Sequence, residues 1–238
     1  MCTVIAAERS GMMPIVMTQA TPIVFVVDGD VSERESLECL IRSGGWHPVV
    51  FGSALDFLAH PRVFVPHCLV LDVLLPDLNG LDLQTRMALE RHDMPIIFIS
   101  GCGDVRLTVR AMKAGAEEFL IKPVDNEALL TAIRRSIELS GASLSREMDV
   151  EALRECYASL SGRERQVMTL VVSGLSNRQV GNELGITEGT VKTHRGRVME
   201  KMKAASIPDL VRMAGRLAPR AIGHDPSNEP LVGSEDFE

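Results

Sequence analysis

Polar residues stand where four short apolar runs end: Asp28 and Asp30, Asp72, Ser100, and Lys122. Four apolar or near-apolar residues, for example, lead directly into Asp72. Such runs are too short for a buried helix and suit strands that are covered on both faces. Parallel strands end at one edge of a sheet, where open α/β folds place their chemistry. We therefore expect these five side chains to converge at that edge.

The chemistry that this set of residues suits is phosphoryl transfer. Mg²⁺ takes oxygen ligands and uses one or two carboxylates together with waters. Asp28 and Asp72 are the predicted metal ligands, and Asp30 is a further candidate. The ion would offset charge on the attacking Asp72 carboxylate and on the phosphoryl group. Lys122 would pair with the aspartyl phosphate, and Ser100 would donate a hydrogen bond to a phosphoryl oxygen.

Each of these residues also has a purely structural explanation. Asp72 can cap a helix, Ser100 can satisfy a neighbouring backbone group, and Lys122 can be solvated. Their coincidence at four strand ends favours a shared site.

Apolar runs alternate with segments of helical spacing, which predicts five strands and five helices. The strands are expected at Ile23–Val27, Val49–Phe51, Leu69–Asp72, Pro95–Ser100 and Glu118–Ile121. The helices are expected at Ser32–Ser43, Ser53–Ala59, Leu81–Arg91, Asp104–Ala114 and Asp125–Leu139, the last with Asp125 as its N-cap. This order predicts an α/β fold with a doubly wound five-stranded parallel sheet.

The chain is expected to contain two domains. Residues 1–20 are predicted to be a flexible leader, or to follow a start codon assigned too far upstream, and residues 21–139 form the α/β domain. A linker is predicted over residues 140–150, because Gly141-Ala-Ser-Leu-Ser145 is rich in small residues. Residues 151–218 show only helical patterns and predict a small all-α domain. The acidic, Pro- and Gly-containing residues 219–238 predict a disordered tail.

Charge is unevenly distributed along the 238 residues, whose net charge is −7. Residues 22–140 carry 11 Lys and Arg against 17 Asp and Glu, whereas residues 150–220 carry 12 against 7. A basic segment beside an acidic one indicates that only the second domain meets a polyanion. No apolar stretch approaches the ~20 residues of a membrane helix. The five cysteines are scattered and form no CxxC motif, so a reducing cytoplasm is expected.

The helical domain has the pattern of a helix-turn-helix. Ser161 with Glu164 forms a capping box, Gly185 marks a turn, and Thr187 caps the following basic helix. In that helix the apolar residues Val191, Val198 and Met202 are expected to face the core. The predicted DNA-binding residues are Lys192, Thr193 and Arg195 for the major groove, Arg197, Arg178 and Asn177 for phosphates, and Thr190 beside them. A simple solvated face is the alternative.

Residues 22–139 resemble a response-regulator receiver domain of the FixJ type, which has the flavodoxin-like fold. The matching segments are Val26-Val27-Asp28, Leu71-Asp72-Val73 with Pro76 and Gly80, Ile97–Gly101, Ala111–Ala116 and Phe119–Pro123. The resemblance implies that Asp72 accepts phosphate from a sensor histidine kinase and that Lys122 binds the phosphate. It also implies that Ser100 and Phe119 are the switch residues, and that the Lys122–Pro123 bond is cis.

Residues 160–203 resemble the LuxR/NarL/FixJ-type DNA-binding domain. The matching segments are Gly174–Asn177, Leu184–Ile186 and Gly189–His194. The resemblance implies that the helix around Pro208–Leu217 is a dimerisation helix. For His194 we expect a packing role in the helix and no ligand role.

One position departs from the receiver pattern. The first strand of the family usually ends in two adjacent acids, the second of which binds Mg²⁺ directly, and here the pair is Asp28-Gly29. Loss of one charge-assisted ligand would weaken Mg²⁺ binding by roughly tenfold or more. Gly29 indicates either a weakened or inactive site, or an altered chain of lowered activity.

The predicted function is that of a DNA-binding, two-component transcription regulator. Its expected partners are double-stranded DNA, a sensor kinase and RNA polymerase, and no membrane association is expected. After phosphorylation we expect a homodimer that activates target genes. The first alternative is a regulator that works without phosphate through a degenerate receiver. The second is a flavodoxin-like enzyme with a DNA-binding tail, although no phosphate-cradling glycine loop follows the first strand. We expect the chain not to be an enzyme.

Overall fold

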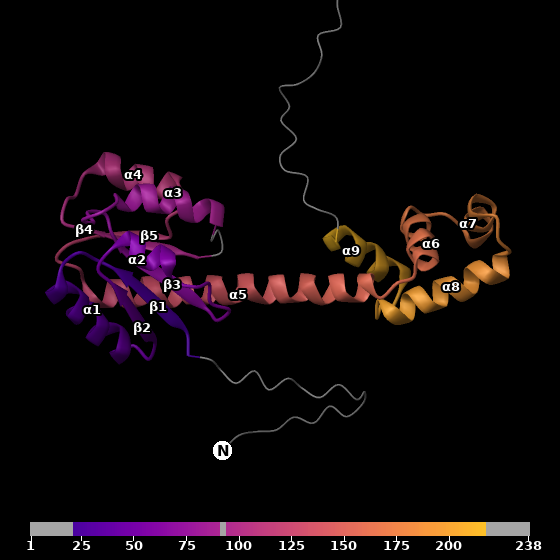
Figure 1. Ribbon diagram of the computed structural model, residues 1–238, viewed down its shortest axis with the longest axis horizontal. Helices are drawn as coiled ribbons and strands as arrows, with labels where there is room; N and C mark the ends of the chain where they lie inside the picture. Colours follow the sequence, from indigo (N-terminus) through magenta and orange to yellow (C-terminus); the bar gives the residue numbers. More distant parts are fainter. Residues whose placement is uncertain (1–20, 91–93, 218–238) are drawn as a thin grey trace, which may run out of the picture. The chain divides into compact units, whose positions relative to one another are not determined.

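The computed structural model describes residues 21–90 and 94–217, and the predicted leader and tail at 1–20 and 219–238 lie outside this part. The chain divides into two compact units between Ser145 and Arg146. Within the described ranges, none of the helices combines the length and apolar character needed to cross a bilayer. Each unit is described by itself (Figure 1).

The first unit is built on a five-stranded parallel sheet, as predicted. Its strands are β1 (Ile23–Val27), β2 (His47–Phe51), β3 (His67–Asp72), β4 (Ile96–Ser100) and β5 (Glu118–Ile121). Their order in the sheet is β2-β1-β3-β4-β5, and the register pairs Val27 with Leu71. The strand order changes direction at β1 and β3, which places the ends of these two strands side by side. β2 starts two residues earlier than predicted, because Pro48 is tolerated in an edge strand.

Helices cover both faces of the sheet (Figure 1). They are α1 (Val31–Ser43), α2 (Ala54–Ala59), α3 (Gly80–Glu90), α4 (Val105–Lys113) and α5 (Asn126–Ala158). Alternate strand residues point to opposite faces. Phe25, Leu69 and Phe98 therefore pack with residues of α2, α3 and α4, whereas Val26 and Ile97 pack with residues of α1 and α5. Both clusters are buried, so the strand ends are held from above and below.

The predicted end of the fifth helix at Leu139 is wrong, because α5 continues to Ala158 through the predicted linker. A single Gly141 costs a helix only about 1 kcal/mol relative to alanine, and no proline interrupts the stretch. Burial also continues beyond Gly141, since Leu144 is 8% and Leu153 is 9% exposed, on opposite faces of the helix. The burial of these two leucines outweighs the weak breaking signal of one glycine and several small residues.

The second unit contains the later part of α5 and four short helices. These are α6 (Gly162–Val172), α7 (Asn177–Leu184), α8 (Glu188–Lys201) and α9 (Ile207–Leu217). The capping box of Ser161 and Glu164 begins α6 as predicted. Gly185 ends α7 in the left-handed conformation, with φ of 64°, and so allows the short turn into α8. Val191, Val198 and Met202 are buried in the core of this unit, as predicted.

Substitution of Gly141 tests whether the predicted linker is helical. A Cβ at Gly141 would make an ordinary contact of 3.6 Å with Pro66 Cγ. We expect Gly141→Ala to raise the free energy of unfolding by about 0.5–1 kcal/mol, and Gly141→Pro to lower it by about 3 kcal/mol. Urea unfolding followed by circular dichroism measures both changes. Near-zero changes for both variants would indicate a flexible linker instead.

Candidate functional site

An ammonium group joins the ends of three strands. Asp28 follows β1, Asp72 ends β3, and Lys122 follows β5. Lys122 Nζ lies 2.9 Å from Asp72 Oδ2 and 3.0 Å from Asp28 Oδ2. Both carboxylates are buried, and the Lys122 side chain is 18% exposed. The structure therefore brings together three of the five predicted side chains, as the parallel sheet led us to expect.

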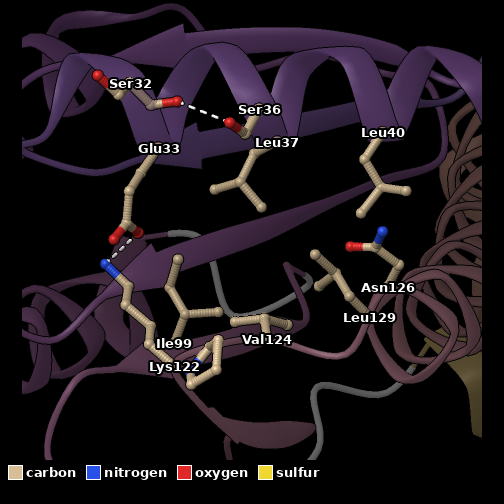
Figure 2. A pocket seen from close by; sticks show the side chains of 11 residues that line it. Ser32, Glu33, Ser36, Leu37, Leu40, Ile99, Lys122, Val124, Asn126 and Leu129 are labelled. Carbon is tan, nitrogen blue, oxygen red and sulfur yellow. Dashed lines mark hydrogen bonds and ion pairs between the residues drawn. The ribbon is translucent and has the colours of Figure 1, made fainter.

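A third carboxylate, missed by the sequence analysis, also contacts Lys122. Glu33 lies in the first turn of α1, and its Oε2 is 2.5 Å from Lys122 Nζ. Figure 2 shows this side chain reaching from α1 to the lysine. An acid in a first helical turn is normally explained by its interaction with the helix dipole, so its type and position gave no signal of this contact. An ammonium group has three donors, and here they face three carboxylates.

The same contacts shift the pKa of Lys122 upward. Burial alone would lower the pKa of this ammonium group, but the hydrogen bonds to Glu33, Asp72 and Asp28 outweigh that effect and raise it. Lys122 is therefore fully charged at neutral pH.

Asp72 is held firmly on the side away from the lysine. Its Oδ1 accepts a hydrogen bond of 3.0 Å from Leu74 N–H. Gly80, at the start of α3, lies against the backbone of Asp72, and a Cβ there would be 2.6 Å from the Asp72 carbonyl oxygen. Only glycine allows this close approach, which explains in physical terms why Gly80 accompanies Asp72.

The predicted switch residues lie beside the cluster, and Ser100 meets Lys122 through the backbone, where its carbonyl accepts a 2.8 Å hydrogen bond from Lys122 N–H. Ser100 is buried, and its hydroxyl donates to the carbonyl of Cys102 and accepts from the Cys102 N–H, both at 3.2 Å. Phe119 packs against Phe98, with ring centroids 6.0 Å apart. The Lys122–Pro123 bond is cis, as the resemblance implied. The switch roles themselves stay predictions.

Asp30 does not point into the cluster. Its Oδ1 accepts a 3.0 Å hydrogen bond from Glu33 N–H and thereby caps α1, and its own N–H donates to Asp28 Oδ1. The side chain of Asp30 is thus committed to the helix start. At Gly29 a Cβ would lie 3.3 Å from Pro76 Cδ, so a larger residue there requires a shift of only a few tenths of an ångström.

Two carboxylates remain for a metal ion. In the described part of the chain, no group of three or more His, Cys, Asp or Glu side chains is arranged to hold one. Asp28 and Asp72 both reach the same ammonium group, so their oxygens are close enough to share a cation. Mg²⁺ in proteins commonly uses one or two carboxylates and completes its shell with water. The donor set therefore fits Mg²⁺ at its minimum.

In the second unit, most of the predicted DNA-binding residues are exposed. Lys192, Thr193 and Arg197 on α8 are open to solvent, and so are Arg178 on α7 and Thr190. The hydroxyl of Thr190 lies 2.9 Å from that of Thr187 at the helix start.

Arg195 differs from the other predicted contacts because it is half-buried. Its Nη1 donates a 2.8 Å hydrogen bond to Asn177 Oδ1, which ties α8 to the start of α7. His194 is also half-buried, and its Nδ1 is buried without a hydrogen-bond partner among the described residues. Arg195, predicted to contact bases, and Asn177, predicted to contact phosphates, are therefore paired with each other in this structure.

An ion pair between the buried Glu164 and the exposed Lys201 links α6 to α8. Lys201 Nζ lies 2.7 Å from Glu164 Oε2, and the same oxygen accepts from Ser161 N–H at 2.9 Å. The hydrogen bond from Lys201, together with that from the Ser161 backbone, lowers the pKa of Glu164 from 4.5 to about 2. The carboxylate thus stays ionised far into the acid range.

Comparison with known proteins gives both units a class. Residues 24–134 match the model of the response regulator receiver domain, and residues 158–214 match that of the bacterial regulatory proteins of the luxR family. A receiver domain followed by a LuxR-type helix-turn-helix defines a DNA-binding response regulator.

Individual relatives cover most of the chain. Nodulation protein W of Bradyrhizobium diazoefficiens is 49% identical over 195 residues, which are 82% of this chain and 86% of that protein. The transcriptional regulatory protein FixJ of Azorhizobium caulinodans is 41% identical over 83% of this chain and 93% of its own. A solved structure of the response regulator StyR covers 83% of this chain and 100% of its own, with 43% identity and a TM-score of 0.74. The chain belongs to the FixJ-type family of two-component response regulators.

The Glu164–Lys201 pair makes a prediction about acid stability. Because the pKa of Glu164 is lowered by folding, its contribution is complete above pH 4.5 and is lost as the pH falls toward about 2. We expect the thermal midpoint of the helical unit, followed by NMR signals of α6 and α8, to fall across this range. Glu164→Gln should lower the midpoint at pH 6 and flatten the dependence. Glu200→Gln, on the exposed face of α8, is the control, and parallel curves for all three proteins would contradict the prediction.

Proposed function

We propose that the chain accepts a phosphoryl group at Asp72 from a sensor histidine kinase and controls transcription through α8. The supporting observation is the contact of Lys122 with both Asp72 and Asp28, at 2.9 and 3.0 Å, at the edge of the sheet. A buried carboxylate beside a fixed ammonium group and a second acid suits phosphoryl transfer better than it suits a purely structural ion pair.

The residues have distinct parts in this chemistry. An oxygen of Asp72 forms the new bond to phosphorus, while the bond from phosphorus to the kinase histidine breaks and its electron pair stays on the ring nitrogen. Mg²⁺, when bound by Asp28 and Asp72, supplies positive charge that offsets the negative charge of the phosphoryl group. Lys122 then pairs with a phosphoryl oxygen. Ser100 joins it by giving up its hydrogen bonds to Cys102.

The output of this change is an altered surface on the first unit. Apolar side chains of α4 and β5 are exposed, and they are Val105, Val109, Met112 and Ile121. Repacking of Ser100 and Phe119 below this surface would alter it, and a homodimer formed there would pair two DNA-binding units. In the proposal the dimer binds paired half-sites in double-stranded DNA, contacts RNA polymerase in the cytoplasm, and activates transcription.

Phosphorylation at Asp72 is directly testable. We expect incubation with acetyl phosphate and Mg²⁺ to give one acid-labile phosphate per chain and to tighten binding to operator DNA by tenfold or more, which corresponds to about 1.4 kcal/mol. Phosphate-affinity gels and DNA titrations measure the two effects. Asp72→Asn should abolish both. Equal phosphate incorporation in Asp72→Asn would exclude Asp72 as the acceptor.

Gly29 favours one alternative, in which the receiver regulates DNA binding without phosphate. The site then lacks a carboxylate at the place where a third metal ligand would stand. Gly29→Asp distinguishes the two functions, because it adds a carboxylate at that place. The structure leaves nearly enough room for its Cβ.

We expect Gly29→Asp to raise Mg²⁺ affinity by roughly tenfold, since it adds a charged ligand. Isothermal titration measures the affinity, and Gly29→Asn provides the same size without the charge. Under the proposed function, phosphodonor strengthens DNA binding by the wild type and by Gly29→Asp alike. A response confined to Gly29→Asp would favour the phosphate-independent alternative.

A further inference from the structure

The lysine at the candidate site has no donor to spare. Lys122 has three N–H groups, and they face Asp28, Asp72 and Glu33 at 3.0, 2.9 and 2.5 Å. A phosphoryl group on Asp72 also needs a donor from this lysine. One of the existing contacts therefore has to be given up when the phosphoryl group arrives.

The three carboxylates differ in how easily they release the lysine. The side chain of Asp28 is 1% exposed, whereas that of Glu33 is 43% exposed. A buried carboxylate that loses its partner is left without compensation, which is costly. An exposed one is solvated at once, and such pairs contribute little to stability. Of the two acids that are not phosphorylated, Glu33 is therefore the one that gives way more readily.

Glu33 also approaches the lysine from a different element. It lines a cavity with Ser32 and Ser36 of α1, and Lys122 lies across that cavity (Figure 2). Neither Asp28 nor Asp72 is among the residues that line it. Glu33 therefore contacts the ammonium group from the α1 side, apart from the acids that would hold the metal ion.

We infer that Glu33 competes with the phosphoryl group for Lys122 and so limits phosphorylation of this receiver. This inference rests on the proposed phosphorylation of Asp72. In the unmodified protein Glu33 holds the ammonium group, and on phosphorylation it releases one N–H donor to a phosphoryl oxygen. No proton is transferred: the Asp72 carboxylate loses its charge when it forms the acyl phosphate, the phosphoryl oxygens carry negative charge in its place, and Glu33 and Lys122 stay ionised. Glu33 acts as a positioning residue, through Lys122.

The opposite effect would follow if Glu33 replaced the acid that is absent at Gly29. It would then help to hold the metal ion, and its removal would reduce phosphorylation. The two roles thus predict changes of opposite sign, which makes a single substitution decisive.

The test compares the wild type with Glu33→Gln and Glu35→Gln. Glutamine keeps the size of Glu33 and leaves intact the backbone hydrogen bond to Asp30. Glu35 is an exposed residue of the same helix, so its substitution makes the same change of net charge elsewhere. The first measurement is the yield and half-life of phosphate at Asp72 with acetyl phosphate and Mg²⁺. The second is the rate at which an amine-acylating reagent modifies Lys122 without phosphodonor, read by mass spectrometry.

We expect Glu33→Gln to raise the yield of the phosphorylated protein by about two- to fivefold, in keeping with the loss of one exposed ion pair. It should also speed acylation of Lys122, while Glu35→Gln matches the wild type in both measurements. An unchanged or lower phosphate yield in Glu33→Gln would overturn the inference, and so would an equal effect of Glu35→Gln.

The second measurement separates this inference from the proposed function. If no protein takes up phosphate, the proposed function fails, and with it the part of the inference that concerns phosphorylation. The contact between Glu33 and Lys122 is then judged by acylation alone. An unchanged acylation rate in Glu33→Gln would refute that contact as well.

Discussion

The ammonium group of Lys122 is the interaction on which the rest of the site depends. It follows β5 at one side of the sheet, yet it contacts acids at the ends of β3 and β1, so its long stem crosses the intervening strand end. Without it, two buried carboxylates would stand side by side, and their repulsion and desolvation would oppose folding of the strand ends. The lysine therefore has a structural part even before any phosphoryl group arrives. In the unmodified protein it is charged and contacts three carboxylates.

Sequence patterns predicted the convergence of Asp28, Asp72 and Lys122 because convergence follows from the parallel sheet itself. Short apolar runs fix the strands, and the strands fix which polar residues share an edge. Sequence patterns did not predict the orientation of each side chain. Asp30 stands two residues after Asp28, but a local hydrogen bond to Glu33 N–H turns it to the helix start. Ser100 likewise bonds within its own loop. Local partners can redirect a short polar side chain, and the type of residue does not reveal the outcome.

Longer-range contacts explain the other differences. Glu33 comes from a helix and not from a strand end, so the pattern of polar residues at strand ends does not include it. Gly141 indicated a linker, whereas α5 runs on through this stretch with Leu144 and Leu153 buried. By contrast, the capping box of Ser161 and the turn at Gly185 were predictable, because each is a strong signal that acts within a few residues. Prediction was thus good where a local motif or the sheet geometry sets the result, and poor where a single distant contact does.

The positions of Gly29 and Glu33 together give the site an unusual balance. Three carboxylates still face the lysine, so its charge is well compensated. One of the three, however, lies on α1 and is open to solvent, while the position beside Asp28 carries no side chain at all. Only two of the three carboxylates that neutralise the lysine, Asp28 and Asp72, are therefore placed to bind a metal ion. A receiver arranged in this way keeps its resting state stable but offers a metal ion only two carboxylates. Under the proposed function, phosphorylation of Asp72 then depends on how readily the exposed carboxylate of Glu33 exchanges the lysine for water.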